Sequence, residues 1–160
     1  MANTPIIRQV AWWALIPQLL FMWLLVFVFY LLSVEQFILF GALSYLMISF
    51  LLRNLIPTNH RKGIKLTKEL KFQEAIAEYK KSIQFFTKHS WLDKYRYLVL
   101  LNSSKMGFRE MGLCNIAFCY GQIGNVNEAE KYYNRVLNEF PKNGIAQTGI
   151  RMINSIREND

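Results

Sequence analysis

The feature that most constrains this chain is a run of 23 residues, Val10 to Leu32, that contains no charged side chain. As a helix it would be about 34 Å long, enough to cross a hydrocarbon core of about 30 Å. A second apolar run begins at Phe37 and reaches Ile56 if Arg53, near its end, directs its charge toward the lipid headgroups. We therefore predict two membrane-spanning helices, residues 10–32 and 37–56.

Only four residues, 33–36, separate the two apolar runs, so the two helices must form an antiparallel hairpin. A cleaved signal peptide fits poorly, because its apolar core has about 7–15 residues and precedes a small-residue cleavage site. Two core helices of a soluble domain also fit poorly, because each would carry a polar stripe. Residues 1–56 are therefore predicted to be a transmembrane hairpin in contact with lipid.

The basic residues near the predicted spans indicate their orientation. Arg8 precedes the first span, whereas the turn between the spans carries one charge, that of Glu35. Basic residues follow the second span, among them Arg53, Arg61, Lys62 and Lys65. Because basic flanks stay in the cytoplasm, we predict a multi-pass protein of the cell membrane (inner or plasma membrane) with both termini cytoplasmic. These four residues either only set the topology or also bind anionic lipid.

A helix-turn-helix pattern occupies residues 108–141. Its positions are Leu113, Ile116, Ala117, Tyr120, Gly124, Ala129, Tyr133, Val136 and Pro141. This spacing resembles the tetratricopeptide repeat (TPR), a unit of 34 residues. The resemblance implies that Ala117 and Ala129 lie where the two helices approach closely, that Gly124 lies in the turn and that Tyr133 fills the groove between helices.

A weaker copy of the pattern occupies residues of about 56–89, with Gly63, Leu66, Ala75 and Tyr79 at matching spacings. The alanines of the two units are 54 residues apart instead of 34, which predicts an inserted helix at about 90–102. A final amphipathic segment, 143–158, is predicted to cap the array. The predicted fold class is thus all-α: the hairpin, then a small TPR-like domain (an α-α superhelix) over residues 57–160.

Taken whole, the chain resembles a bacterial membrane-anchored TPR protein. The resemblance implies a scaffold for protein binding at the cytoplasmic face, in which the first helix of each repeat lines a groove for a protein or peptide. The candidate groove residues are Met111, Asn115, Phe118 and Gln122, which share one helix face. We expect an adaptor; the alternative is an accessory subunit of a larger membrane complex, held mainly by its hairpin.

No arrangement of residues typical of catalysis, cofactor binding or metal binding is found in the sequence. Cys114 and Cys119 are five residues apart and would point about 140° apart on one helix, so they cannot share a metal. His60 and His89 have no ligand spacing between them. We therefore expect no enzymatic activity and no cofactor. Nucleic acid is not expected as a partner either, because the basic charge lies beside a membrane anchor.

Overall fold

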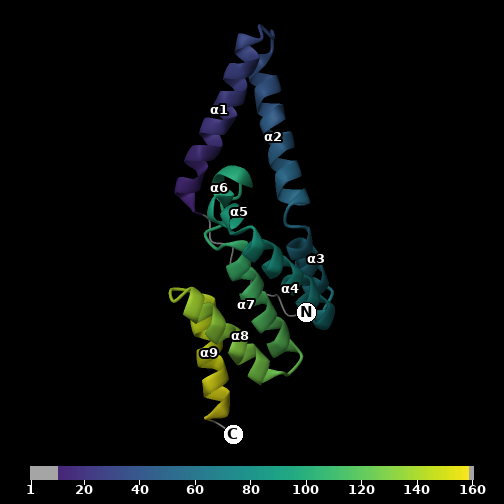
Figure 1. Cartoon of the computed structure of the whole chain (residues 1–160), viewed down its shortest axis with the longest axis vertical. Helices are drawn as coiled ribbons and strands as arrows, with labels where there is room; N and C mark the ends of the chain where they lie inside the picture. The colour runs from purple at the N-terminus through teal and green to yellow at the C-terminus, as the bar shows by residue number, and fades with distance from the viewer. Residues whose placement is uncertain (1–10, 159–160) are drawn as a thin grey trace. The chain divides into compact units, whose positions relative to one another are not determined.

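The computed structural model describes residues 11–158. Within these residues it contains nine α-helices, one short 3-10 helix and no strand (Figure 1), which confirms the predicted all-helical class. Val10 and Arg8, used in the prediction of the first span and its orientation, lie outside the described residues. The helices are η1 (Trp12–Ala14), α1 (Leu15–Leu31), α2 (Phe37–Leu55), α3 (Thr58–Lys68), α4 (Phe72–Lys88), α5 (Ser90–Lys94), α6 (Arg96–Val99), α7 (Phe108–Gln122), α8 (Val126–Glu139) and α9 (Gly144–Arg157).

The described residues form two compact units. The hairpin unit consists of residues 11–57 and 90–105, and the C-terminal unit consists of residues 58–89 and 106–158. This division differs from the predicted one, which assigned everything after residue 56 to one domain. The segment predicted as one inserted helix is also different: it forms two short helices, α5 and α6, and it belongs with the hairpin.

The hairpin unit is built around α1 and α2, which pack against each other and expose most of their apolar side chains. Residues Trp12–Leu31 and Phe37–Leu55 are each long and apolar enough to cross a membrane. Pro17 lies in the first turn of α1, where the amide hydrogen that proline lacks would have no helical partner. Its position therefore explains why it does not interrupt the helix.

Small and polar residues line the contact between α1 and α2. A Cβ atom on Gly41 would lie 2.6 Å from the Cα of Val26, so only glycine allows this approach. Gln18 and Ser49 are buried, and the hydroxyl of Tyr45 donates to Oε1 of Gln18 at 3.5 Å. Such contacts hold helices together in lipid, where apolar burial between helices gives no advantage.

Hydrogen bonds at the open end of the hairpin explain why residues 90–105 belong to this unit. The Ala11 amide donates to the carbonyl of Ser103 at 2.8 Å. The Arg53 guanidinium donates to the carbonyl of Leu101 through Nε, at 3.0 Å, and through Nη2. The loop that contains Leu101 and Ser103 thus binds both the start of the first apolar helix and the end of the second.

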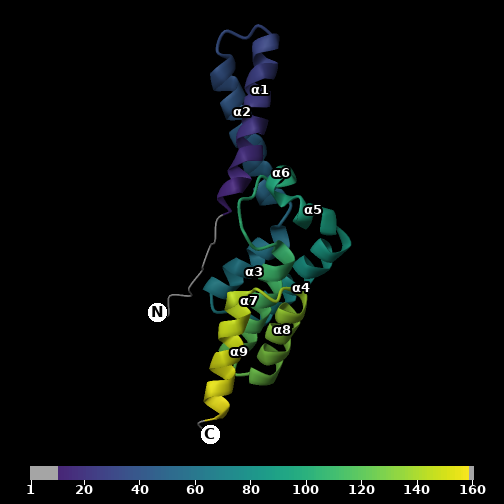
Figure 2. The same cartoon turned by 90° about the vertical axis from the view of Figure 1, so that its left-hand side faces the viewer.

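The C-terminal unit is a series of helices in which α3 packs on α4, α4 on α7, α7 on α8 and α8 on α9 (Figure 2). Its core contains Ala75, Leu113, Ile116 and Val136, all fully buried. Tyrosine rings lie over glycines at two of these contacts. A Cβ atom on Gly63 would lie 2.7 Å from the ring of Tyr79, and one on Gly149 would lie 2.6 Å from the ring of Tyr133.

The turns between paired helices share one geometry. Leu70, after α3, has φ 61°, and Gly124, after α7, has φ 79°. In both turns the next amide donates back to the carbonyl five residues earlier: Lys71 to Leu66 and Asn125 to Tyr120, each at 2.9 Å. These are the left-handed ends with which helices commonly stop.

Candidate functional site

A groove on the C-terminal unit is the best candidate for a binding site. Its floor is formed by Ile83 of α4 and Ile116 of α7, which are 8% and 0% exposed. Its rim carries polar and basic side chains of α4 and α8 on both sides of this floor. The eight lining residues are Lys80, Ile83, Gln84, Thr87, Lys88, Ile116, Tyr132 and Arg135, and none of these is acidic.

The sequence of α4 places three of these rim residues together. Lys80, Gln84 and Lys88 are four residues apart, so they follow one face of the helix. The floor exists because α4 and α7 pack closely at Gly112, where an added Cβ would lie 2.9 Å from Cγ1 of Ile83. These two patterns place small and apolar residues at the floor of the groove and basic residues at its rim.

The opposite rim is formed by α8. Tyr132 stacks on Tyr120 of α7, with ring centroids 5.6 Å apart, and Lys80 Nζ lies 3.5 Å from the Tyr120 hydroxyl. Arg135 donates from Nε to Oε1 of Glu139 at 3.2 Å. That carboxylate also pairs with Arg109 at 2.9 Å, so one acid is shared between two arginines and the rim keeps its positive charge.

The four residues predicted to line a groove lie elsewhere, on another face of α7. Met111, Asn115 and Phe118 are half-buried and Gln122 is exposed. The Phe118 ring lies 6.4 Å from that of Phe72 in an edge-to-face pair, and it packs against the core of the unit. The four therefore form a continuous helix face, with the phenyl ring partly used for packing.

The basic flank predicted to contact lipid is partly engaged within the protein. Arg53 is held by the Leu101 carbonyl. Lys62 and Lys65 pair with Glu78 and Glu69, at 3.1 and 3.9 Å. Hydrogen bonds from Lys81 and then Lys62 lower the pKa of the Glu78 carboxyl, against its burial.

Two buried cysteines and a buried histidine are held in their uncharged forms. Burial raises the pKa of the Cys114 thiol to about 12 and also raises that of Cys119, so neither is a ready nucleophile. Burial lowers the pKa of His60 to about 4. Over the described part of the chain, no group of three or more His, Cys, Asp or Glu side chains could hold a metal ion.

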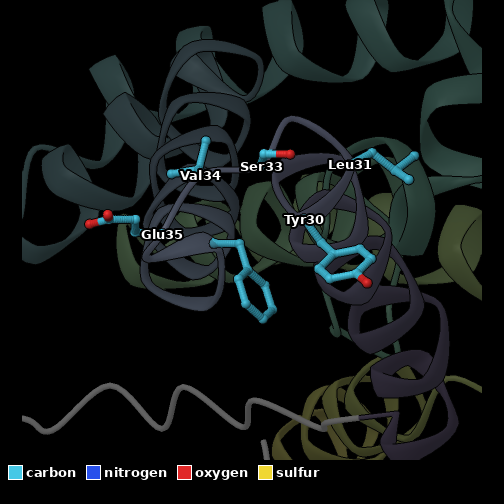
Figure 3. A pocket seen from close by; sticks show the side chains of 6 residues that line it. Tyr30, Leu31, Ser33, Val34 and Glu35 are labelled. Atoms are coloured by element: carbon cyan, nitrogen blue, oxygen red, sulfur yellow. The ribbon is translucent and has the colours of Figure 1, made fainter.

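A shallow hollow also lies at the tip of the hairpin (Figure 3). It is lined by Tyr30, Leu31, Ser33, Val34, Glu35 and Phe37. The carboxylate of Glu35 points away from the Tyr30 ring. The hollow therefore offers no converging polar groups with which to bind or transform a ligand.

Comparison with models of protein families, with curated proteins and with solved structures finds no match for this chain. The candidate site consequently rests on its own geometry. The sequence analysis did not find the groove because its lining comes from three helices, and α4 is separated along the chain from α7 and α8. The available signal was the spacing of Lys80, Gln84 and Lys88 along one helix.

Proposed function

We propose that this protein is a membrane-anchored adaptor. The hairpin crosses the cell membrane, both termini lie in the cytoplasm, and the C-terminal unit, with its helices paired as in a TPR domain, binds a segment of a partner protein. Two helices able to cross a membrane support the anchor. The groove between α4, α7 and α8 supports the binding role and is the observation on which the proposal depends.

The groove favours an acidic segment that carries an apolar anchor residue. Lys80, Lys88 and Arg135 supply positive charge along the rim, and Ile83 with Ile116 supplies an apolar floor. Charged rims mainly set partner choice and association rate, whereas a buried apolar anchor supplies much of the affinity. A peptide that alternates acidic residues with leucine satisfies both requirements.

Binding can be tested with the full chain in lipid nanodiscs and with labelled peptides, followed by fluorescence polarisation. Acidic leucine-containing peptides should bind, and their affinity should fall as salt is raised. Lys88→Glu should weaken binding about tenfold or more, since like charges across an interface cost several kcal/mol. A basic peptide with the same leucines should not bind.

Asn115→Ala on the other face of α7 is the matched control. It should leave the affinity of the acidic peptide unchanged, because Asn115 does not line the groove. If Asn115→Ala weakened binding and Lys88→Glu did not, the predicted face of Met111, Asn115, Phe118 and Gln122 would be the binding surface instead.

The proposed topology can be tested by labelling intact cells with an impermeant thiol reagent. Ser33→Cys, in the turn between α1 and α2, should react from outside, and Asn127→Cys in α8 should not. Cys114 and Cys119 give little background because both are buried. Labelling of Asn127→Cys from outside would reject a cytoplasmic C-terminal unit.

A further inference from the structure

An exposed apolar surface lies on the short segment that joins the hairpin unit from the middle of the chain. Trp91, Tyr95 and Leu98 are 54%, 49% and 57% exposed. Trp91 lies in α5, Leu98 lies in α6, and Tyr95 is the residue between the two helices. The spacings along the chain are four and three residues. Large apolar side chains gathered in this way on a short segment mark a surface that normally contacts something other than water.

The segment is fixed at a definite place in the hairpin unit. The Tyr97 ring lies 4.4 Å from that of Trp13, at the start of the first apolar helix. The loop that follows is bound by Ala11 and Arg53, at the open end of the hairpin. Figure 1 shows α5 and α6 at this open end, opposite the turn. The segment therefore lies level with the ends of both apolar helices.

The lengths of α1 and α2 indicate where the open end of the hairpin lies in a membrane. Residues Trp12–Leu31 and Phe37–Leu55 rise about 30 and 28 Å as helices, close to the thickness of a hydrocarbon core. Their open end then lies at the boundary between acyl chains and headgroups. Trp12 and Trp13, 77% and 62% exposed, are at this end too, as expected for aromatic residues at a membrane interface.

Arg96 links the segment to the loop that follows it. Its guanidinium donates to the carbonyls of Asp93, Ser104 and Lys105 at 2.8, 3.2 and 2.7 Å, and to the Tyr97 hydroxyl at 2.8 Å. The Arg96 guanidinium is thus hydrogen-bonded within the protein. Lys94, whose Nζ lies 5.6 Å from the Tyr95 ring centroid, is the basic residue beside the exposed aromatic pair.

We propose that α5 and α6 form an interfacial membrane-binding segment, which inserts Trp91, Tyr95 and Leu98 into the same bilayer leaflet in which the hairpin ends. The occupant of this surface is lipid because the segment is held at the open end of the hairpin, whose two helices also expose apolar side chains. Tryptophan and tyrosine suit this depth, since their rings are apolar and their polar atoms reach water. The inference rests on the proposed membrane anchor.

The test uses the full chain reconstituted in vesicles of phosphatidylcholine and phosphatidylglycerol that contain brominated lipids, which quench tryptophan. One protein keeps only Trp91 and another keeps only Trp23, the remaining tryptophans being replaced by phenylalanine. Trp91 should be quenched most by bromines near the carboxyl ends of the acyl chains. Trp23, in the middle of the first span, should be quenched most by bromines near the methyl ends.

A charge at the proposed contact gives a second measurement. In the protein that keeps only Trp91, Leu98→Glu should reduce quenching and shift emission to longer wavelength, whereas Leu98→Met should change neither. Trp91 emission like that of indole in water, without quenching, would overturn the proposal. Short-wavelength emission without quenching would overturn it as well, because protein would then cover the surface. In either case strong quenching of Trp23 would leave the membrane anchor intact, and loss of Trp23 quenching would reject the anchor itself.

Discussion

The helix pair α3–α4 and the helix pair α7–α8 follow the same sequence pattern but differ in the residues at several matching positions. With an offset of 54 residues, Ala75 matches Ala129 and Leu70 matches Gly124. Both alanines are buried, and both turn residues have positive φ. The chain keeps the close contact and the turn geometry in both pairs, although it changes the residue that makes the turn.

The first pair carries three features that disfavour folding and that the second pair lacks. His60 and Ser82 are buried, and His60 Nδ1 and Ser82 Oγ have no hydrogen-bond partner among the described residues. The matching positions of the second pair hold Cys114 and Val136, both buried. Leu70 adopts a left-handed conformation that glycine adopts without strain. We therefore expect the first pair to be the less stable one, and each feature can be exchanged between the pairs.

The largest expected effect tests the part that the pairs share. Ala75→Arg and Ala129→Arg should each destabilise the C-terminal unit by roughly 3–5 kcal/mol, because a long charged side chain replaces a buried methyl group. Urea unfolding of the full chain in detergent, followed by circular dichroism, measures this loss. Ala77→Arg, at an exposed position of α4, is the control and should change little. An Ala129→Arg protein as stable as this control would show that α7 and α8 do not pack closely.

Acid should weaken the first pair through His60. Its pKa is about 4 in the folded protein, against 6.5 for a free histidine, because of burial between Tyr79 and Phe108, whose ring centroids lie 5.5 and 5.4 Å away. Between these two pKa values, His60 therefore binds a proton in the unfolded chain but not in the folded protein. The free energy of unfolding should fall between pH 6.5 and pH 4, by up to about 3 kcal/mol.

His60→Cys, which copies the second pair, should flatten this part of the pH dependence. Urea unfolding at several pH values provides the measurement. Tyr79 does not contribute in this range, since burial raises its pKa to about 12. An unchanged slope in the His60→Cys protein would mean that other groups cause the sensitivity to acid.

The buried hydroxyl of Ser82 should have a smaller effect. Ser82→Ala removes an unpaired polar group without adding volume, and it should stabilise the unit by about 1 kcal/mol. The opposite exchange, Val136→Thr, places a hydroxyl at a fully buried position and should destabilise it by about 1–3 kcal/mol. Both are measured by urea unfolding. A loss of stability in Ser82→Ala would indicate that the hydroxyl is bonded in solution.

The smallest effect is expected at the turns. Leu70→Gly should stabilise the first pair by up to about 1 kcal/mol, since glycine adopts φ 61° without strain and Leu70, 69% exposed, buries little. Gly124→Ala should destabilise the second pair by about 1 kcal/mol for the converse reason. Thermal unfolding of both variants provides the comparison. Opposite signs support a shared turn geometry, and equal signs contradict it.

The sequence predicted what depends on local patterns. Uncharged runs of spanning length predicted the two apolar helices, and the helical spacing of apolar residues predicted an all-helical chain. The place of residues 90–105 could not be predicted in this way. The loop is bound through the carbonyls of Leu101 and Ser103, and a backbone carbonyl has no signature in the sequence.

The candidate site was harder to predict than the helices for a similar reason. The face of Met111, Asn115, Phe118 and Gln122 could be predicted because all four residues lie on one helix. The groove needs Lys88, Ile116 and Arg135 from three helices, and their proximity depends on how α4, α7 and α8 pack. Helical spacing describes one helix at a time, so it cannot show a surface that several helices share.

The interleaving of the two units along the chain has a consequence for biosynthesis. A ribosome completes α1 and α2 before it makes the loop at residues 100–105 that binds their ends. It also completes α3 and α4 before it makes α7, which covers Ile83 and Phe86. Nascent chains thus pass through a stage in which one helix pair exposes its inner face. Translation that stops between residues 89 and 108 leaves this face uncovered, and we expect the truncated product to be degraded by the proteases that remove incomplete proteins.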